Sequence, residues 1–198
     1  MHNRGEIGRQ IIHLMVGIVT ASLYYFELID SLMIFVIIIF GGFLSIMSKK
    51  IDIPIIAYFL KNFEREEQKK RMPGKGMIFF FIGSLLVIKL FDKDIACAAI
   101  MVLALGDSIG HIVGSSLGRT KNFIYGKSKK LLEGTLVGAF FGFLGALIFV
   151  PIPEAFFGSL IAMIAEAFEF DMNKKEIDDN LLVPLVAGTI MFLVRSYL

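Results

Sequence analysis

The segment Asp94–Lys121 reads DIACAAIMVLALGDSIGHIVGSSLGRTK. Its residues 95–113 form one apolar run, close to the roughly 20 helical residues that cross the hydrocarbon core of a bilayer. The single acid within the run is Asp107. A helix that starts near Asp94 places it about 19 Å along the axis, well inside a core about 30 Å thick. An ionisable group is costly there, so the segment predicts a membrane helix with a functional carboxylate. The alternative is a structural Asp107 paired with a Lys or Arg from a neighbouring helix.

The rest of the chain has the same apolar character. Of its 198 residues, 56% are hydrophobic and 20 are Phe, and the mean hydropathy is +0.75, too apolar for an ordinary soluble domain. The single cysteine, Cys97, excludes an intrachain disulfide and is expected to serve packing. We predict an all-α, polytopic transmembrane helix bundle that forms one integral membrane domain over residues 1–198. About seven helices are expected from the apolar runs 11–26, 32–47, 77–91, 95–113, 134–150, 155–170 and 181–194.

Charge sets the expected orientation of this bundle. Most of the 20 Lys and Arg residues fall on the N-terminal tail and on alternate connections, whereas the opposite connections are short and mostly acidic. The positive-inside rule then predicts an N-in, C-out protein whose basic face is cytoplasmic. The longest connection carries Ile55, Phe59 and Phe63 at helical spacing, which favours an interfacial helix near residues 54–70. An extension of the preceding membrane helix into the cytosol is the alternative.

Glycines follow Asp107 at four-residue spacing. Gly110, Gly114 and Gly118 form a smooth stripe that lets another backbone approach closely, which is a common packing device. Here the stripe leads from a buried acid into cations, so it could also border a groove for a metal and a phosphate chain. A second stripe, Gly134, Gly138 and Gly142, is more typical of packing. The polar residues that we assign to nucleotide binding beside these stripes are Arg119, Lys121, Lys127, Ser128, Lys130 and Glu133, with Gly134 at the start of the next helix.

Two more polar clusters are expected on the same face. Arg9 and His13 share one side of the first helix with Glu6, where Arg9 could also be a simple topology anchor. Glu166 closes the sixth apolar run, and Asp178, Asp179 and Asn180 precede the seventh, where Asp179 could instead cap the helix. Together with Asp107, the acids Glu166, Asp178 and Asp179 are candidate ligands for Mg²⁺ or another divalent cation. The sequence contains no Walker A loop, no kinase glycine loop and no H-E-x-x-H element.

The run Gly106–Lys121, followed by KSKKLLEGT at residues 127–135, resembles the nucleotide-binding signature of the CTP-dependent lipid kinases. This family includes the dolichol (polyprenol), phytol and diacylglycerol kinases, and is distantly related to CDP-diacylglycerol synthase. Residues 6–13, 71–76 and 178–184 resemble further family elements, and the order is the expected one. Gln10 departs from the pattern, because the family usually has Lys there.

The resemblance implies a catalytic domain that transfers the γ-phosphoryl group of CTP to a membrane lipid alcohol of the dolichol or polyprenol type, with a divalent cation such as Mg²⁺. Asp107, Arg9 and His13 would be catalytic, and the site would face the cytoplasm. Diacylglycerol or a phytol-type alcohol as acceptor, a cytidylyltransferase that makes a CDP-lipid, and a small membrane transporter are the alternatives. The expected partners are CTP, the lipid alcohol and the bilayer, with no nucleic acid; association into a homo-oligomer is left open.

Overall fold

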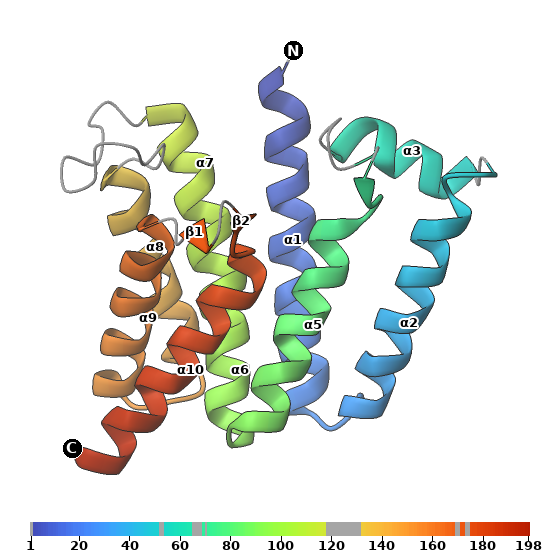
Figure 1. Cartoon of the computed structure of the whole chain (residues 1–198). Helices are drawn as coiled ribbons and strands as arrows, with labels where there is room; N and C mark the ends of the chain where they lie inside the picture. The colour runs from blue at the N-terminus through green and yellow to red at the C-terminus, as the bar shows by residue number, and fades with distance from the viewer. Residues whose placement is uncertain are drawn as a thin grey trace.

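The computed structural model describes residues 2–51, 54–64, 69, 71–117, 132–168, 171–172 and 175–198. Each predicted apolar run matches a helix over most of its length, and the all-α prediction is confirmed (Figure 1). A hairpin of two-residue strands, β1 (Asp171–Met172) and β2 (Lys175–Glu176), precedes the last helix. The helices that match the seven runs are α1 (His2–Tyr25), α2 (Ser31–Met47), α5 (Lys75–Leu90), α6 (Lys93–Met101) with its continuation, α8 (Leu132–Ala146), α9 (Ile152–Ala167) and α10 (Asp179–Tyr197).

The helix that contains Asp107 forms the centre of the bundle. It runs without a break from α6 through a π-helical segment, η1 (Val102–Asp107), into α7 (Ser108–Leu117). About 72% of its most apolar window is buried, against 28% for α1 and α10, so it is the core helix. Cys97 is buried in α6, and its thiol lies 3.7 Å from the backbone oxygen of Ala21, as expected for a packing residue.

The outer helices have the lengths and surfaces of membrane segments. Among the residues that the structure describes, three helical stretches are long and apolar enough to cross a membrane, namely Gly5–Tyr25, Lys93–Ser116 and Asp179–Tyr197, while α2 and α8 are shorter apolar helices. Large apolar side chains are exposed along α2, which packs mainly on α5. Such a surface is unfavourable in water and favourable in lipid. The protein is therefore a membrane helix bundle.

A short helix, α3 (Pro54–Phe63), lies across the end of the bundle that carries the N-terminus (Figure 1). It follows the end of α2 at Met47 as a separate helix, so α2 does not simply continue through this segment; that α3 lies at the membrane interface stays a prediction. The connection is held by Lys49 Nζ, which donates to the Arg71 carbonyl oxygen at 2.6 Å. The C-terminus lies at the opposite end, as an odd number of spans requires. Which end faces the cytoplasm stays a prediction.

An ion-pair network closes the end of the bundle that carries the C-terminus. The Arg195 guanidinium donates to both carboxylate oxygens of Asp94 at 3.1 and 2.6 Å, and to both of Glu154 at 3.1 and 2.6 Å. These residues lie in α10, α6 and α9. The network ties three helices together, so Arg195 does more than extend towards the membrane surface.

Candidate functional site

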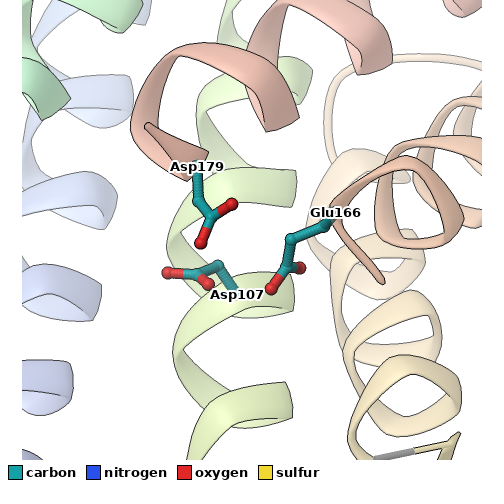
Figure 2. A group of neighbouring side chains, drawn as sticks. All are labelled: Asp107, Glu166 and Asp179. Carbon is teal, nitrogen blue, oxygen red and sulfur yellow. The ribbon is translucent and has the colours of Figure 1, made fainter. Parts of the chain in front are cut away.

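Three carboxylates from three helices meet beside the core helix. Asp107 ends η1, Glu166 lies in the last turn of α9, and Asp179 opens α10. One carboxylate oxygen from each lies within 4.8 Å of the other two, and Figure 2 shows the side chains pointing toward one another. Glu166 is buried, and the two aspartates are partly buried. We call these residues the acid cluster; it contains three of the four residues that the sequence suggested as metal ligands.

The π-helical segment determines how Asp107 is presented. A π-helical turn holds one more residue than an α-helical turn, and such turns occur frequently at functional sites. Each added residue rotates the following side chains by about 100° around the axis, because an α-helix has 3.6 residues per turn. Asp107 is the last residue of this segment, so the direction of its side chain relative to α6 depends on the widened turn.

The two adjacent aspartates at the start of α10 have different roles. Asp178 is the N-cap, since its carboxylate accepts hydrogen bonds from the backbone N–H and the side-chain amide of Asn180 at 3.3 and 2.8 Å. It also forms an ion pair of 2.8 Å with Lys75 Nζ. Asp179 therefore faces the acid cluster, while Asp178 caps the helix. The sequence suggested both aspartates as metal ligands and Asp179 as a possible helix cap. In the structure Asp178 is the cap, and only Asp179 belongs to the acid cluster.

Helix dipoles act in opposite senses on the cluster. Asp179 lies at the N-terminus of α10, where a negative charge is stabilised, but Glu166 lies in the last turn of α9, where it is destabilised. Three carboxylates this close in a partly buried place also repel one another. A hard divalent cation with oxygen ligands, such as Mg²⁺, would relieve both penalties, so the donor set fits that kind of ion.

The polar cluster that was predicted on the first helix is present, and Arg9 in it is paired with a carboxylate. Arg9 donates to Glu6 Oε1 at 2.5 Å, and His111 Nε2 of α7 lies 3.4 Å from the same oxygen. His13 is buried, packs edge-on against the Phe80 ring at 4.9 Å between centroids, and has no hydrogen-bond partner for Nε2 among the described residues. Asp107, Arg9 and Asp178 all lie near enough to act on His13 electrostatically. The α1 residues thus adjoin the acid cluster.

The glycine stripes pack against each other. A Cβ on Gly110 would lie 2.8 Å from the Gly134 backbone oxygen, and one on Gly114 would lie 3.4 Å from Gly134 Cα. Gly138 meets Gly106 in the same way, at 2.7 Å from its backbone oxygen. Backbone of α8 therefore fills the groove in which a nucleotide was expected along Gly110 and Gly114. These two glycines and Gly134 therefore allow helix contact, and their predicted part in nucleotide binding stays a prediction.

Several predicted phosphate-binding residues lie outside the described part of the chain, namely Gly118, Arg119, Lys121, Lys127, Ser128 and Lys130. They stay predictions. Glu133 is described and partly buried in the first turn of α8, and Asn180 is partly buried beside Asp178. Gln10, the departure from the family pattern, is buried in α1 with 3% of its surface exposed, a position where a charged Lys would be costly without a partner.

Comparison with known proteins gives one relative over nearly the full length. The chain is 36% identical over 189 residues to the uncharacterized protein MJ1137 of Methanocaldococcus jannaschii, a match that covers 94% of this chain and 92% of that protein. The chain belongs to the MJ1137 family. This member of the family is also 28% identical over 142 residues to CTP-dependent diacylglycerol kinase 1 of Schizosaccharomyces pombe, covering 66% of the chain and 64% of the kinase. No family model and no solved structure matches.

The sequence of this MJ1137-family protein did not suggest two residues that lie near the candidate site. Lys75 opens α5 and brings a positive charge to Asp178, and His111 faces Glu6 across α1 and α7. Both lie in segments that carried the family resemblance. His111 follows Asp107 by four residues, the spacing of neighbours on one helix face, which was the available signal.

Proposed function

We propose that this protein is a CTP-dependent lipid kinase that transfers the γ-phosphoryl group of CTP to a membrane alcohol of the polyprenol type. The observation that carries the proposal is the acid cluster, in which Asp107, Glu166 and Asp179 come within 4.8 Å of one another in a membrane helix bundle. Intramembrane carboxylates are costly and are retained for function. The similarity to a CTP-dependent diacylglycerol kinase supports the donor and the reaction class.

In the proposed reaction, the lipid hydroxyl oxygen forms a bond to the γ-phosphorus. The bond between that phosphorus and the β–γ bridging oxygen breaks, and CDP leaves with the electron pair. Catalysis of this kind depends mainly on positioning and on neutralising negative charge. A divalent cation held by the acid cluster would supply part of that neutralisation.

The residues of the chain supply the remaining functions. In this proposal His13 contributes charge near the point of transfer, and the hydroxyl proton leaves to a base that the proposal does not assign; His13 Nε2 is buried without a hydrogen-bond partner among the described residues. In this proposal Lys75 and Arg9 each attract a phosphate oxygen, although Lys75 also balances Asp178 and Arg9 also balances Glu6. The undescribed segment 118–131 contributes the further cations in this proposal.

The test is phosphoryl transfer by the purified protein in bilayer nanodiscs. CTP labelled in the γ position is supplied with dolichol, shorter polyprenols, phytol or diacylglycerol, and a parallel reaction uses CTP labelled in the α position. We expect the γ label alone to enter lipid, with a polyprenol as the best acceptor. Entry of the α label would instead identify a cytidylyltransferase, and no transfer to any acceptor would refute both activities.

Asp107→Asn should abolish the transfer while the protein still inserts and accumulates. Asp92→Asn is the matched control, because Asp92 is a 76% exposed carboxylate at the opposite end of the same helix. Its rate should equal that of the wild type. Retained activity in Asp107→Asn would remove the acid cluster from the mechanism.

A further inference from the structure

An apolar pocket of about 290 Å³ lies between α2 and α5 and is closed at one end by α3. Its volume is near the lower limit of small-molecule sites, which span roughly 300–1,000 Å³. Apart from two serines and two glycines, its lining comprises Pro73 and large apolar side chains. The Ser48 hydroxyl donates to the Ser45 carbonyl oxygen, so it is already satisfied. The residues that line it are Ile37, Ile38, Phe40, Gly41, Leu44, Ser45, Ser48, Leu60, Pro73, Gly74, Met77, Ile78 and Phe81.

The pocket follows one face of α5 for about 10 Å. Gly74, Met77, Ile78 and Phe81 are spaced three and four apart, so they share a face, and seven residues of helix rise about 10 Å. Another face of α5 meets α10, because a Cβ on Gly83 would lie 2.0 Å from the Asn180 backbone oxygen. Helix α5 therefore separates the pocket from the start of α10, where Asp179 joins the acid cluster.

The start of α5 leaves a way between these two places. Gly74 and Lys75 are neighbours; Gly74 lines the pocket, and Lys75 pairs with Asp178, one residue from Asp179. In the described structure, no heavy atom lies within 4 Å of where a Cβ would be on Gly74 or Gly76. Gly74 also has a φ of 74°, a left-handed conformation that favours glycine. The Glu64 carboxylate holds the turn from another side by accepting a hydrogen bond from the Gly74 N–H at 3.3 Å, and the side on which the two Cβ atoms would lie stays open.

We propose that this pocket binds the hydrocarbon chain of the acceptor alcohol, and that the chain passes over the Gly74–Gly76 turn so that its hydroxyl reaches the acid cluster. The proposal rests on the proposed kinase function and specifies where the acceptor lies. An apolar pocket of this volume, bordered by two helices, suits part of one hydrocarbon chain, such as the first isoprene units of a polyprenol. Its position at the edge of the bundle, beside the exposed α2, allows entry from the bilayer.

Two adjacent glycines of α2 provide the test and its control. A Cβ on Gly41 would lie 3.5 Å from Ile78 Cγ1, an ordinary contact, so the ring of Gly41→Phe should extend into the pocket. A Cβ on Gly42 has no described atom within 4 Å, so Gly42→Phe makes the same chemical change outside the pocket lining. We expect Gly41→Phe to raise the KM for a long polyprenol at least tenfold with the KM for CTP unchanged. Gly42→Phe should behave as the wild type.

A second measurement does not depend on turnover. A polyprenol analogue that carries a photoreactive diazirine is crosslinked to the protein without CTP, and the labelled residues are mapped by mass spectrometry. We expect labelling of Leu44 and Met77. The labelling should fall at least fivefold in Gly41→Phe and should be unchanged in Gly42→Phe. If this pattern is found but no alcohol is phosphorylated, the pocket stands and the kinase proposal fails. Phosphorylation by both variants alike, with labelling elsewhere, would overturn the pocket proposal.

Discussion

Glu166→Gln should make the protein more stable without divalent cations and should weaken its stabilisation by them. Two unit charges 4.8 Å apart repel by about 3.5 kcal/mol at an effective dielectric constant of about 20. Glu166 takes part in two of the three pairs of the acid cluster, so at this dielectric constant the two pairs together repel by about 7 kcal/mol when all three carboxylates are charged. Protonation within the cluster lowers this repulsion. We expect a gain of about 2 kcal/mol, which raises the unfolding temperature of a chain this long by roughly 4–8 °C.

Mg²⁺ should stabilise the wild type more than the Glu166→Gln variant. A ligand at 100 times its Kd stabilises the folded state by about 2.7 kcal/mol, so saturating Mg²⁺ should raise the unfolding temperature of the wild type by roughly 5–10 °C. In Glu166→Gln the rise should fall below half of that value, because one of three ligands has lost its charge. Asp179 and Asp107 remain, so weak binding at high Mg²⁺ concentration is expected.

The assay can use the only cysteine of the chain. Cys97 is fully buried in the core helix, so a thiol-reactive fluorogenic dye reports its exposure on unfolding in detergent. Each protein is heated with EDTA and with Mg²⁺. Glu27→Gln is the matched control, since Glu27 is an exposed glutamate that pairs with Lys93 at 2.7 Å away from the cluster. A Glu166→Gln variant that is less stable in EDTA and keeps the full response to Mg²⁺ would refute the metal assignment.

Two further predictions concern packing and ion pairing. Gly110→Leu should destabilise the protein by more than about 3 kcal/mol, because its Cβ would lie 2.8 Å from the Gly134 backbone oxygen. Overpacking typically costs about 1–3 kcal/mol even where the neighbouring side chains can move. The dye assay should show this loss of stability, and Gly42→Leu, the control, should be as stable as the wild type. Arg195→Ala should cost about 3 kcal/mol by leaving Asp94 and Glu154 without their cation. Adding Glu154→Gln should restore part of that loss in a double-mutant cycle, and an additive result would contradict the network.

The helices of this protein could be predicted from sequence because lipid imposes one simple rule. Backbone groups in a bilayer must be bonded within a helix, so apolar runs become helices whatever their neighbours are. The acids of the site could be predicted for the same reason, since Asp107 and Glu166 interrupt such runs. Their meeting depends on tertiary contacts, and hydropathy alone could suggest only that they share one face of the bundle.

The finer roles could not be read from the sequence. Asp178 and Asp179 are adjacent acids at a helix start, and either can cap; the contact of Asp178 with Lys75 decides between them, and it joins residues 103 positions apart. The glycine stripe was equally ambiguous. Spacing shows that a smooth face exists, but whether a nucleotide or another helix occupies it depends on the position of α8.

The π-helical segment lets the core helix both pack against α8 and contribute to the acid cluster. Gly106, Gly110 and Gly114 must face α8, while Asp107, one residue from Gly106, must face α9 and α10. Residues adjacent in a helix point about 100° apart, so one helix can serve both partners after the widened turn. Before it, α6 is buried by apolar contacts on nearly every side. The widened turn therefore lets one continuous helix pack in the core at one end and contribute Asp107 to the acid cluster at the other. It lies where the site of the proposed chemistry begins.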